Sequence, residues 1–131
     1  RLVALTLMAF CAGCAPSLQA EVLSGGETVL SVEVDLAESE DARRSGLRDY
    51  SSLSPEQGLL LVFPGVSEVC ITNRGVAFAI DAVFVEAGRV SAVESFGAEE
   101  DSLRCHRADE VLEVVAGVAS RVRVGDEFRR D

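Results

Sequence analysis

The sequence contains no lysine, so all twelve of its basic residues are arginine. Twenty-two acidic residues outnumber them, and the formal net charge at pH 7 is −10. Because nucleic-acid binding depends largely on basic side chains that neutralise phosphates, no nucleic-acid partner is expected. The same charge disfavours adhesion to an anionic membrane surface. The length of 131 residues is enough for one domain with a modest core.

Motifs for several kinds of site are also missing. His106 is the only histidine, and a metal site made with Cys70 and Cys105 would match no structural zinc spacing. The acidic run 99–101 lacks the Asp-x-Asp-x-Asp-Gly pattern of a calcium loop. No glycine-rich loop is suited to hold a phosphate. The sequence therefore predicts no metal, no cofactor and no identifiable set of catalytic residues.

An apolar segment opens the chain. Residues 2–12 are almost entirely apolar and follow Arg1. Eleven residues are too few for a helix that spans a bilayer, but they suit the hydrophobic region of a signal peptide. We therefore predict that residues 1–20 are a leader and that the protein is exported. Its expected location is the periplasmic or outer-surface side of a bacterial membrane.

The segment Cys11–Cys14 resembles a bacterial lipobox, in which small residues precede a cysteine that becomes the lipid-modified N-terminus. Cys14 is the lipidation candidate, and a lipid anchor would be the only contact with the membrane. Cleavage by the ordinary signal peptidase after Ala20 is the alternative. Residues 21–28 include two adjacent glycines and are expected to form a short tether, and residues 29–131 a single domain.

Two cysteines remain once the leader is set aside. Cys70 and Cys105 form an even pair in a compartment that oxidises thiols, so a disulfide between them is the first expectation. Such a bond would stabilise the domain by roughly 2–4 kcal/mol. Separate buried thiols and a catalytic cysteine are the alternatives.

Short apolar segments separated by glycine turns predict the fold class. Side chains alternate in polarity over residues 30–36, which is typical of a half-buried strand. A short helix is expected within residues 37–46, where Ser39 can cap the N-terminus and Gly46 can end it. Further strands are expected at residues 59–63, 69–72, 76–85, 90–96, 111–116 and 122–128. The sequence therefore predicts a mainly β (β-rich α+β) fold, a compact single-domain, barrel-like sheet with one or two short helices.

The longest apolar run of the body, residues 76–85, contains one charged residue, Asp81. A carboxylate in a strand covered on both faces is unfavourable unless it is paired. Arg74 could reach Asp81 if the turn at Gly75 folds the chain back, and Arg43 is a second possible partner. An arginine with Asp81 could form a pocket for an anion or a carboxylate. The alternative is a structural aspartate that pairs with an arginine or accepts backbone N–H bonds.

The segment 97–110 is long for a loop, and such loops are often functional. It includes Cys105 and His106, a thiol and an imidazole that could act as nucleophile and base in a hydrolase. Adjacent residues of an extended chain point to opposite sides, which works against a direct bond between these two. Cys105 and His106 are therefore taken as candidate ligand-binding residues.

Several short motifs occur in an order and spacing that resemble one known family. They lie between residues 30 and 128 and include Arg43–Leu47, Gly58–Pro64, Arg74, Ile80–Val85, Gly88–Val90, Cys105, Val111–Val114 and Gly125–Asp126. In these motifs the chain is similar to the bacterial and archaeal family called domain of unknown function 192. The resemblance implies a β-rich, often exported protein without an established activity. The chain departs from the family pattern at Arg48, Thr72–Val76, Ala79 and His106, which would alter any ligand pocket that the family shares.

From these features we expect an exported, lipid-anchored envelope protein. It would act as an accessory module that binds a small ligand or another envelope protein. The candidate ligand-binding residues are Arg43, Arg74, Asp81, Cys105 and His106. A cysteine- or carboxylate-dependent hydrolase and a purely structural envelope domain are the alternatives.

Overall fold

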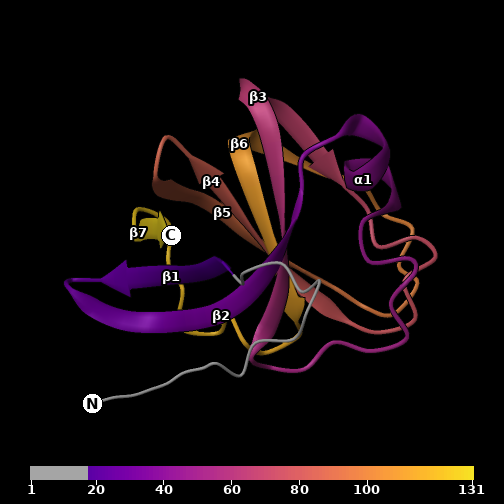
Figure 1. Cartoon of the computed structure of the whole chain (residues 1–131), viewed down its shortest axis with the longest axis horizontal. Helices are drawn as coiled ribbons and strands as arrows, with labels where there is room; N and C mark the ends of the chain where they lie inside the picture. The colour runs from indigo at the N-terminus through magenta and orange to yellow at the C-terminus, as the bar shows by residue number, and fades with distance from the viewer. Residues whose placement is uncertain (1–17) are drawn as a thin grey trace, which may run out of the picture.

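The computed structural model describes residues 18–131, so the predicted leader with Cys11 and Cys14 lies outside the described residues. Within them the chain forms one helix and seven strands, most of which are labelled in Figure 1. The strands are β1 (Leu18–Ser24), β2 (Glu27–Ala37), β3 (Gln57–Ile71), β4 (Ile80–Glu86), β5 (Arg89–Phe96), β6 (Arg104–Val115) and β7 (Glu127–Arg130), and helix α1 (Glu40–Ser45) lies between β2 and β3. No helix in this part of the chain is long and apolar enough to cross a membrane.

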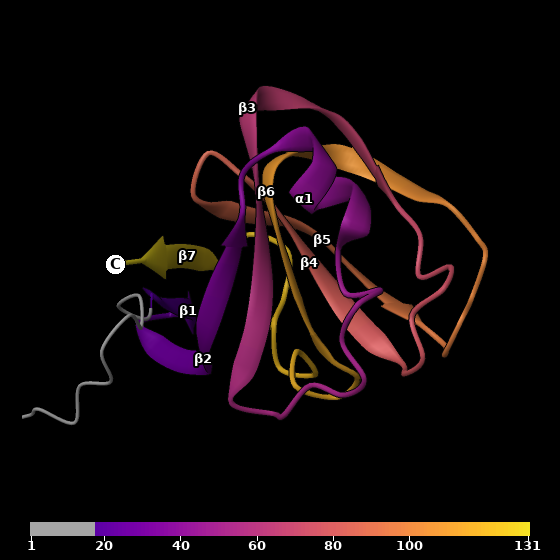
Figure 2. The same cartoon turned by 45° about the vertical axis from the view of Figure 1, so that its right-hand side comes forward.

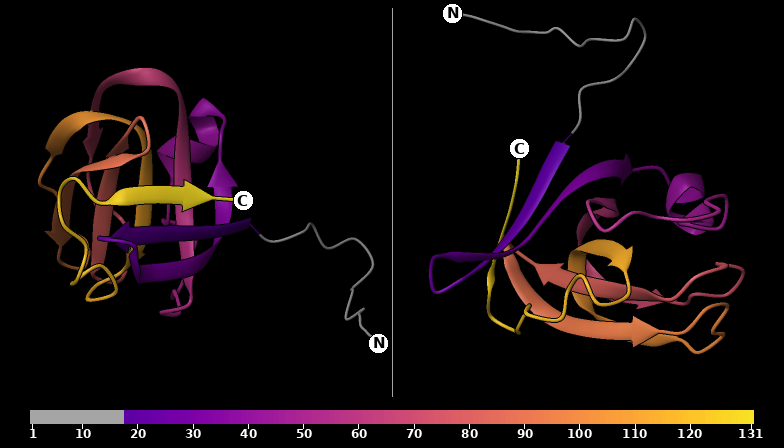
Figure 3. Two further views of the ribbon diagram at one scale, coloured as in Figure 1. Left: turned by 90° about the vertical axis from the view of Figure 1, so that its left-hand side faces the viewer. Right: turned by 90° about the horizontal axis from the view of Figure 1, so that it is seen from below.

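The strands close into a barrel in the order β1-β2-β3-β6-β4-β5-β7, and β7 pairs with β1. Neighbouring strands are antiparallel except β2 and β3, which run parallel because α1 and the loop after it carry the chain back between them. Figure 3 shows β7 alongside β1, and it places the β1–β2 hairpin and α1 at opposite ends of the molecule. The prediction of a mainly β, barrel-like single domain is confirmed.

Two hydrophobic cores lie on the two faces of the sheet. In β4, Val83 and Val85 belong to one core, whereas Ala82 and Phe84 belong to the other, as expected when side chains alternate along a strand. The first core receives side chains from all seven strands and fills the barrel. The second core lies outside the barrel on β3, β4, β5 and β6, and Leu47 covers part of it. Figure 2 shows α1 on this outer side, beside β3.

Helix α1 begins and ends as the sequence predicts. The Ser39 side chain accepts a hydrogen bond from the backbone N–H of Ala42 at 3.1 Å, which satisfies one of the free donors of the first turn. Gly46 follows the last turn with φ of 51°, and its N–H donates to the Ala42 carbonyl. Because φ is positive there, a glycine is favoured at this position. The helix is thus fixed in the place where it borders the second core.

Strand β3 differs from the prediction, which placed two short strands at residues 59–63 and 69–72. A single strand of fifteen residues runs through both and through Pro64. Its register with β6 shifts between Val62 and Ser67, so the ladder is interrupted where the proline stands. The first half of β3 therefore belongs to the barrel, and the second half forms an arm with β6 that extends beyond it.

The tether predicted at residues 21–28 is wrong. These residues belong to β1, to a turn at Gly25–Gly26 and to the start of β2. Ala20 and Val22 are fully buried in the barrel, and β1 pairs with both β2 and β7. Both glycines have positive φ, so the pair makes a hairpin turn and not a flexible linker.

Three other predicted boundaries differ from those in the structure. The strand predicted at residues 76–85 begins only at Ile80, and the strand predicted at residues 122–128 begins only at Glu127. The supposed long loop 97–110 is shorter, because β6 begins at Arg104. Cys105 and His106 therefore lie on a strand, where their side chains have fixed directions.

Candidate functional site

Asp81 and Arg74 do not meet in the structure. Asp81 is 5% exposed, and its Oδ2 accepts hydrogen bonds from the backbone N–H groups of Gly117 (2.9 Å) and Ala119 (3.2 Å). Its Oδ1 accepts a hydrogen bond from the Ser95 hydroxyl at 2.8 Å. Arg74 is exposed and forms no ion pair within the part of the chain that the structure describes. Asp81 is therefore a structural aspartate that accepts backbone N–H bonds, and these bonds hold the turn that follows β6.

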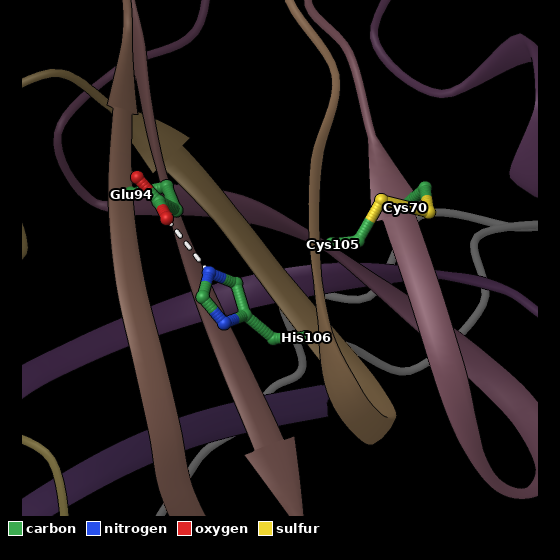
Figure 4. The surroundings of a disulfide bond; sticks show 4 residues. All are labelled: Cys70, Glu94, Cys105 and His106. Carbon is green, nitrogen blue, oxygen red and sulfur yellow. Dashed lines mark hydrogen bonds and ion pairs between the residues drawn. A yellow bond between two sulfur atoms is a disulfide. The ribbon is translucent and has the colours of Figure 1, made fainter.

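Cys105 and His106 also point apart, as Figure 4 shows. Cys105 forms a disulfide with Cys70, its direct partner across the β3–β6 ladder, which confirms the predicted bond. The His106 Nε2 lies 2.7 Å from the Glu94 Oε2, and the imidazole packs edge-on against Phe84. Since the disulfide occupies the thiol, a hydrolase with Cys105 as nucleophile has no support in this structure.

The His106 contact belongs to a small polar cluster around Glu94. Arg104 donates to the Glu94 Oε1 at 2.9 Å and pairs with Glu100 at 2.6 Å. The hydrogen bond to His106, together with those from Arg104, lowers the pKa of Glu94. Every charge in the cluster therefore has a partner, and none is left for a ligand.

Arg43 borders a cavity. Its Nη1 donates to the carbonyl oxygens of Glu38 (2.6 Å) and Val62 (2.9 Å), and its guanidinium lies over the Phe63 ring at 4.9 Å. These contacts join the end of α1 to β3. Arg43 thus acts first as a clamp that holds the helix against the second core.

A cavity of about 190 Å³ lies between the C-terminal end of α1 and the arm of β3. We call it the Glu113 cavity. Its lining consists of Arg43, Arg44, Ser45, Gly46, Leu47, Arg48, Leu61, Cys70, Ile71, Thr72, Asn73, Val76 and Glu113.

Glu113 is a buried acid of this cavity. It lies near the end of β6, opposite Leu59 of β3 and Ala82 of β4, and is 5% exposed. A Cβ atom placed on Gly46 would lie 3.9 Å from its Oε1, so the carboxyl sits just beneath the end of α1. Burial raises the pKa of Glu113 to about 7, and no cation or hydrogen-bond donor among the described residues offsets that rise. A carboxyl in such a setting changes its charge near neutral pH.

Asn73 is a second polar group of the same cavity. The side chain is fully buried, and its Nδ2 donates to the carbonyl oxygens of Phe78 (3.0 Å) and Gly97 (2.9 Å). Its Oδ1 has no hydrogen-bond partner among the described residues. Buried polar atoms without partners are rare and unfavourable in folded proteins. Two residues that line the Glu113 cavity thus carry acceptor atoms without a partner, and of these atoms the Asn73 Oδ1 itself is sealed from solvent.

The sequence interpretation missed both residues. Glu113 interrupts the apolar stretch 111–116 just as Asp81 interrupts 76–85, so the same reasoning could have selected it. Asn73 carries no comparable signal, because an asparagine before Arg-Gly is typical of an exposed turn.

Within the described residues no group of three His, Cys, Asp or Glu side chains is placed to hold a metal ion.

The disulfide ties together the two strands of the arm that borders the Glu113 cavity. Replacing Cys70 and Cys105 together by serine is expected to lower the free energy of unfolding by about 2 kcal/mol, because the unfolded chain is then less constrained. Urea unfolding of the double variant against the oxidised parent measures the change. The reduced parent serves as control and should lose the same amount. Equal stability of all three proteins would contradict the prediction.

The family DUF192, described as Uncharacterized ACR, COG1430, matches residues 21–129. A structure from Sinorhizobium meliloti 1021, described as that of a "putative transcription regulator", aligns with a TM-score of 0.79 and 21% identity over 88% of this chain and 94% of that one. A protein of unknown function from Novosphingobium aromaticivorans DSM 12444 aligns with a TM-score of 0.80 and 18% identity over 86% of this chain and 84% of that one. No curated protein matches.

At these identities the two solved structures are evidence for the fold alone. The family match is broader evidence, because it spans nearly all the described residues, from within β1 to within β7. It also agrees with the motif order read from the sequence. The chain therefore belongs to the uncharacterised family DUF192.

Proposed function

We propose that this chain is an exported, lipid-anchored envelope module that binds a small ligand in the Glu113 cavity. One observation carries the binding role: two buried polar side chains, Glu113 and Asn73, border one cavity and have acceptor atoms without partners. A bound molecule that supplies hydrogen-bond donors would give the Glu113 carboxylate a partner. Groups kept at an energetic disadvantage to the fold are common in functional sites.

The volume of the cavity sets the size of the ligand. A cavity of about 190 Å³ is close to the engineered cavity of ~150 Å³ that accepts benzene, so on the order of six to ten non-hydrogen atoms can enter. Typical sites for drug-sized molecules are larger, at roughly 300–1,000 Å³. The proposal is therefore restricted to small molecules, and a protein partner is not required by the cavity.

Three probes of similar shape test the binding role: 1-butylamine, 1-butanol and butyrate. Each is titrated at millimolar concentration into the isotope-labelled full chain while backbone amide resonances are followed. We expect at least one probe to move the resonances of Gly46, Leu47 and Asn73 in a saturable way. The turn Gly25–Gly26, at the other end of the molecule, is the internal control and should not respond. If no probe moves the cavity resonances, the binding role is wrong.

Export and the lipid anchor rest on different support. Three residues separate Cys14 from the start of β1, whereas cleavage after Ala20 would remove the first three residues of that strand. Ala20 is fully buried in the barrel, so its loss would open the sheet where β1 meets β7. The Cys70–Cys105 disulfide suits an oxidising compartment. These points favour Cys14 as the processed N-terminus.

Metabolic labelling with an alkyne fatty acid tests the anchor. We expect the full chain in a bacterial host to take up the label, Cys14→Ser to lose it, and the matched control Cys11→Ser to keep it. Recovery of an unlabelled protein that begins at Glu21 would show cleavage after Ala20 and would overturn the anchor.

A further inference from the structure

We propose that the ligand of the Glu113 cavity is a small organic cation, an alkylammonium or guanidinium compound, whose N–H groups bond to the Glu113 carboxylate. This inference rests on the proposed binding role and names the chemical class of its ligand. It follows from two observations. The unpaired polar atoms of the cavity lining are hydrogen-bond acceptors, and the arginines of the lining already donate to other groups.

Both unused groups call for donors. The Asn73 Oδ1 can only accept a hydrogen bond, because the amide nitrogen of the same side chain already donates to two carbonyls. An ionised Glu113 also only accepts. A ligand that brings several N–H donors on one cationic centre fits the Glu113 carboxylate. A charged donor gains most, since hydrogen bonds with an ionised partner are stronger than neutral ones.

The arginines of the cavity lining do not satisfy Glu113 in place of a ligand. Arg43 donates to two backbone carbonyls, and Arg48 donates to the carbonyls of Arg44 and Arg74 at 3.0 Å each. Arg44 pairs with Glu40 and Asp41 on the exposed face of α1. All three arginines are thus engaged with the backbone or with other acids, and none forms an ion pair with Glu113.

The remaining surroundings of Glu113 are apolar. Leu59 of β3 and Ala82 of β4 are its neighbours across the ladders, and Leu61, Ile71 and Val76 line the cavity wall. No ionisable residue of β3 or β4 lines the cavity. Such walls suit the hydrocarbon part of an alkylammonium ion, and they keep the dielectric low, which strengthens its attraction to the carboxylate.

An anionic ligand fits less well. A carboxylate in this cavity would face the ionised Glu113 with no cation directed at either group. Like charges placed together in a site strongly disfavour their joint ionisation. The anion-binding pocket predicted from the sequence is therefore replaced by a cation-binding one.

The three butyl probes distinguish this inference from the binding role itself. We expect 1-butylamine to bind at least tenfold more tightly than 1-butanol at pH 8, with butyrate the weakest. Between pH 6 and pH 8 the affinity for 1-butylamine should rise about tenfold, because the amine stays charged while Glu113 ionises around its pKa of about 7. Affinity for 1-butanol should stay nearly constant over the same range.

Two variants complete the test. Glu113→Gln keeps the shape of the side chain and should abolish both the preference for 1-butylamine and its pH dependence. Glu68→Gln removes an exposed acid on the arm of β3 and should change neither. If 1-butanol or butyrate binds as tightly as 1-butylamine, or if the preference survives Glu113→Gln, the cationic class is wrong while the binding role stands. If no probe binds, the binding role itself is wrong.

Discussion

Glu113→Gln is expected to raise the free energy of unfolding by about 3 kcal/mol at pH 8 and by less than about 1 kcal/mol at pH 5. The parent must keep a carboxyl in an apolar setting with no partner, and above neutral pH that carboxyl is charged. Glutamine has nearly the same shape and no charge. The variant therefore removes the desolvation penalty of the ionised form and leaves the packing almost unchanged.

The sign of the pH dependence follows from the two pKa values of Glu113. Its pKa is about 7 in the folded chain and 4.5 in an exposed glutamate. Between these values the folded state binds more protons than the unfolded state, so stability falls as the pH rises. The parent should lose stability from about pH 5 to pH 8 relative to the variant, and the difference should level off above pH 8.

Urea unfolding at pH 5, 6, 7 and 8 measures this difference directly. Glu68→Gln is the matched control, since that side chain is exposed and the variant should follow the parent at every pH. A constant difference between Glu113→Gln and the parent over this range would show that the carboxyl does not titrate there. Lower stability of Glu113→Gln at pH 8 would show that the carboxylate has a stabilising partner.

Asp81→Ala is expected to lower the free energy of unfolding by about 4 kcal/mol. The carboxylate accepts from two backbone N–H groups, those of Gly117 and Ala119, and from the Ser95 hydroxyl. Alanine leaves these donors without a partner, and the Ala119 amide is buried where water cannot replace the lost bond. Each buried donor left unsatisfied costs about 1–3 kcal/mol.

Asp81→Asn separates the hydrogen bonds from the charge. The asparagine oxygen can accept from both amides while its nitrogen donates to Ser95, so a loss of only about 1–2 kcal/mol is expected. Thermal and urea unfolding of the two variants, with Asp49→Ala as an exposed control, measure the losses. If Asp81→Ala unfolds like the parent, Asp81 has no structural role and the assignment of this residue is wrong.

Glu113 and Asp81 both lie in apolar strands, but only Asp81 finds hydrogen-bond donors among the described residues. Asp81 stands near the start of β4, where the turn after β6 presents N–H groups to it. Glu113 lies at the same end of the sheet, next to Val114, which is the ladder partner of Asp81. Because side chains alternate along β6, Glu113 shares the outer face with Val111, whereas Asp81 and Val114 face the barrel core. The face of the sheet, and not the position along the strand, therefore decides which of the two carboxylates meets the free N–H groups of the turn.

The fold class, the position of α1, the disulfide and the family could all be predicted from the sequence. Each depends on local or compositional signals: alternation over 30–36, the cap at Ser39, an even pair of cysteines and the order of short motifs. Such signals can be read without the tertiary structure, because they depend only on neighbouring residues or on residue counts.

The side chains that share a site could not be predicted in the same way, because they come together only in the folded chain. Arg74 and Asp81 are seven residues apart and do not meet, whereas Glu113 and Gly46, which are far apart in the sequence, line the same cavity. The crossover from β2 to β3 places α1 over the outer face of β6, and the interrupted ladder in β3 lets its arm form one wall of the cavity. These arrangements depend on which strands pair and in which register. The pairing is set by the burial of two cores over the whole chain, and no local pattern encodes it.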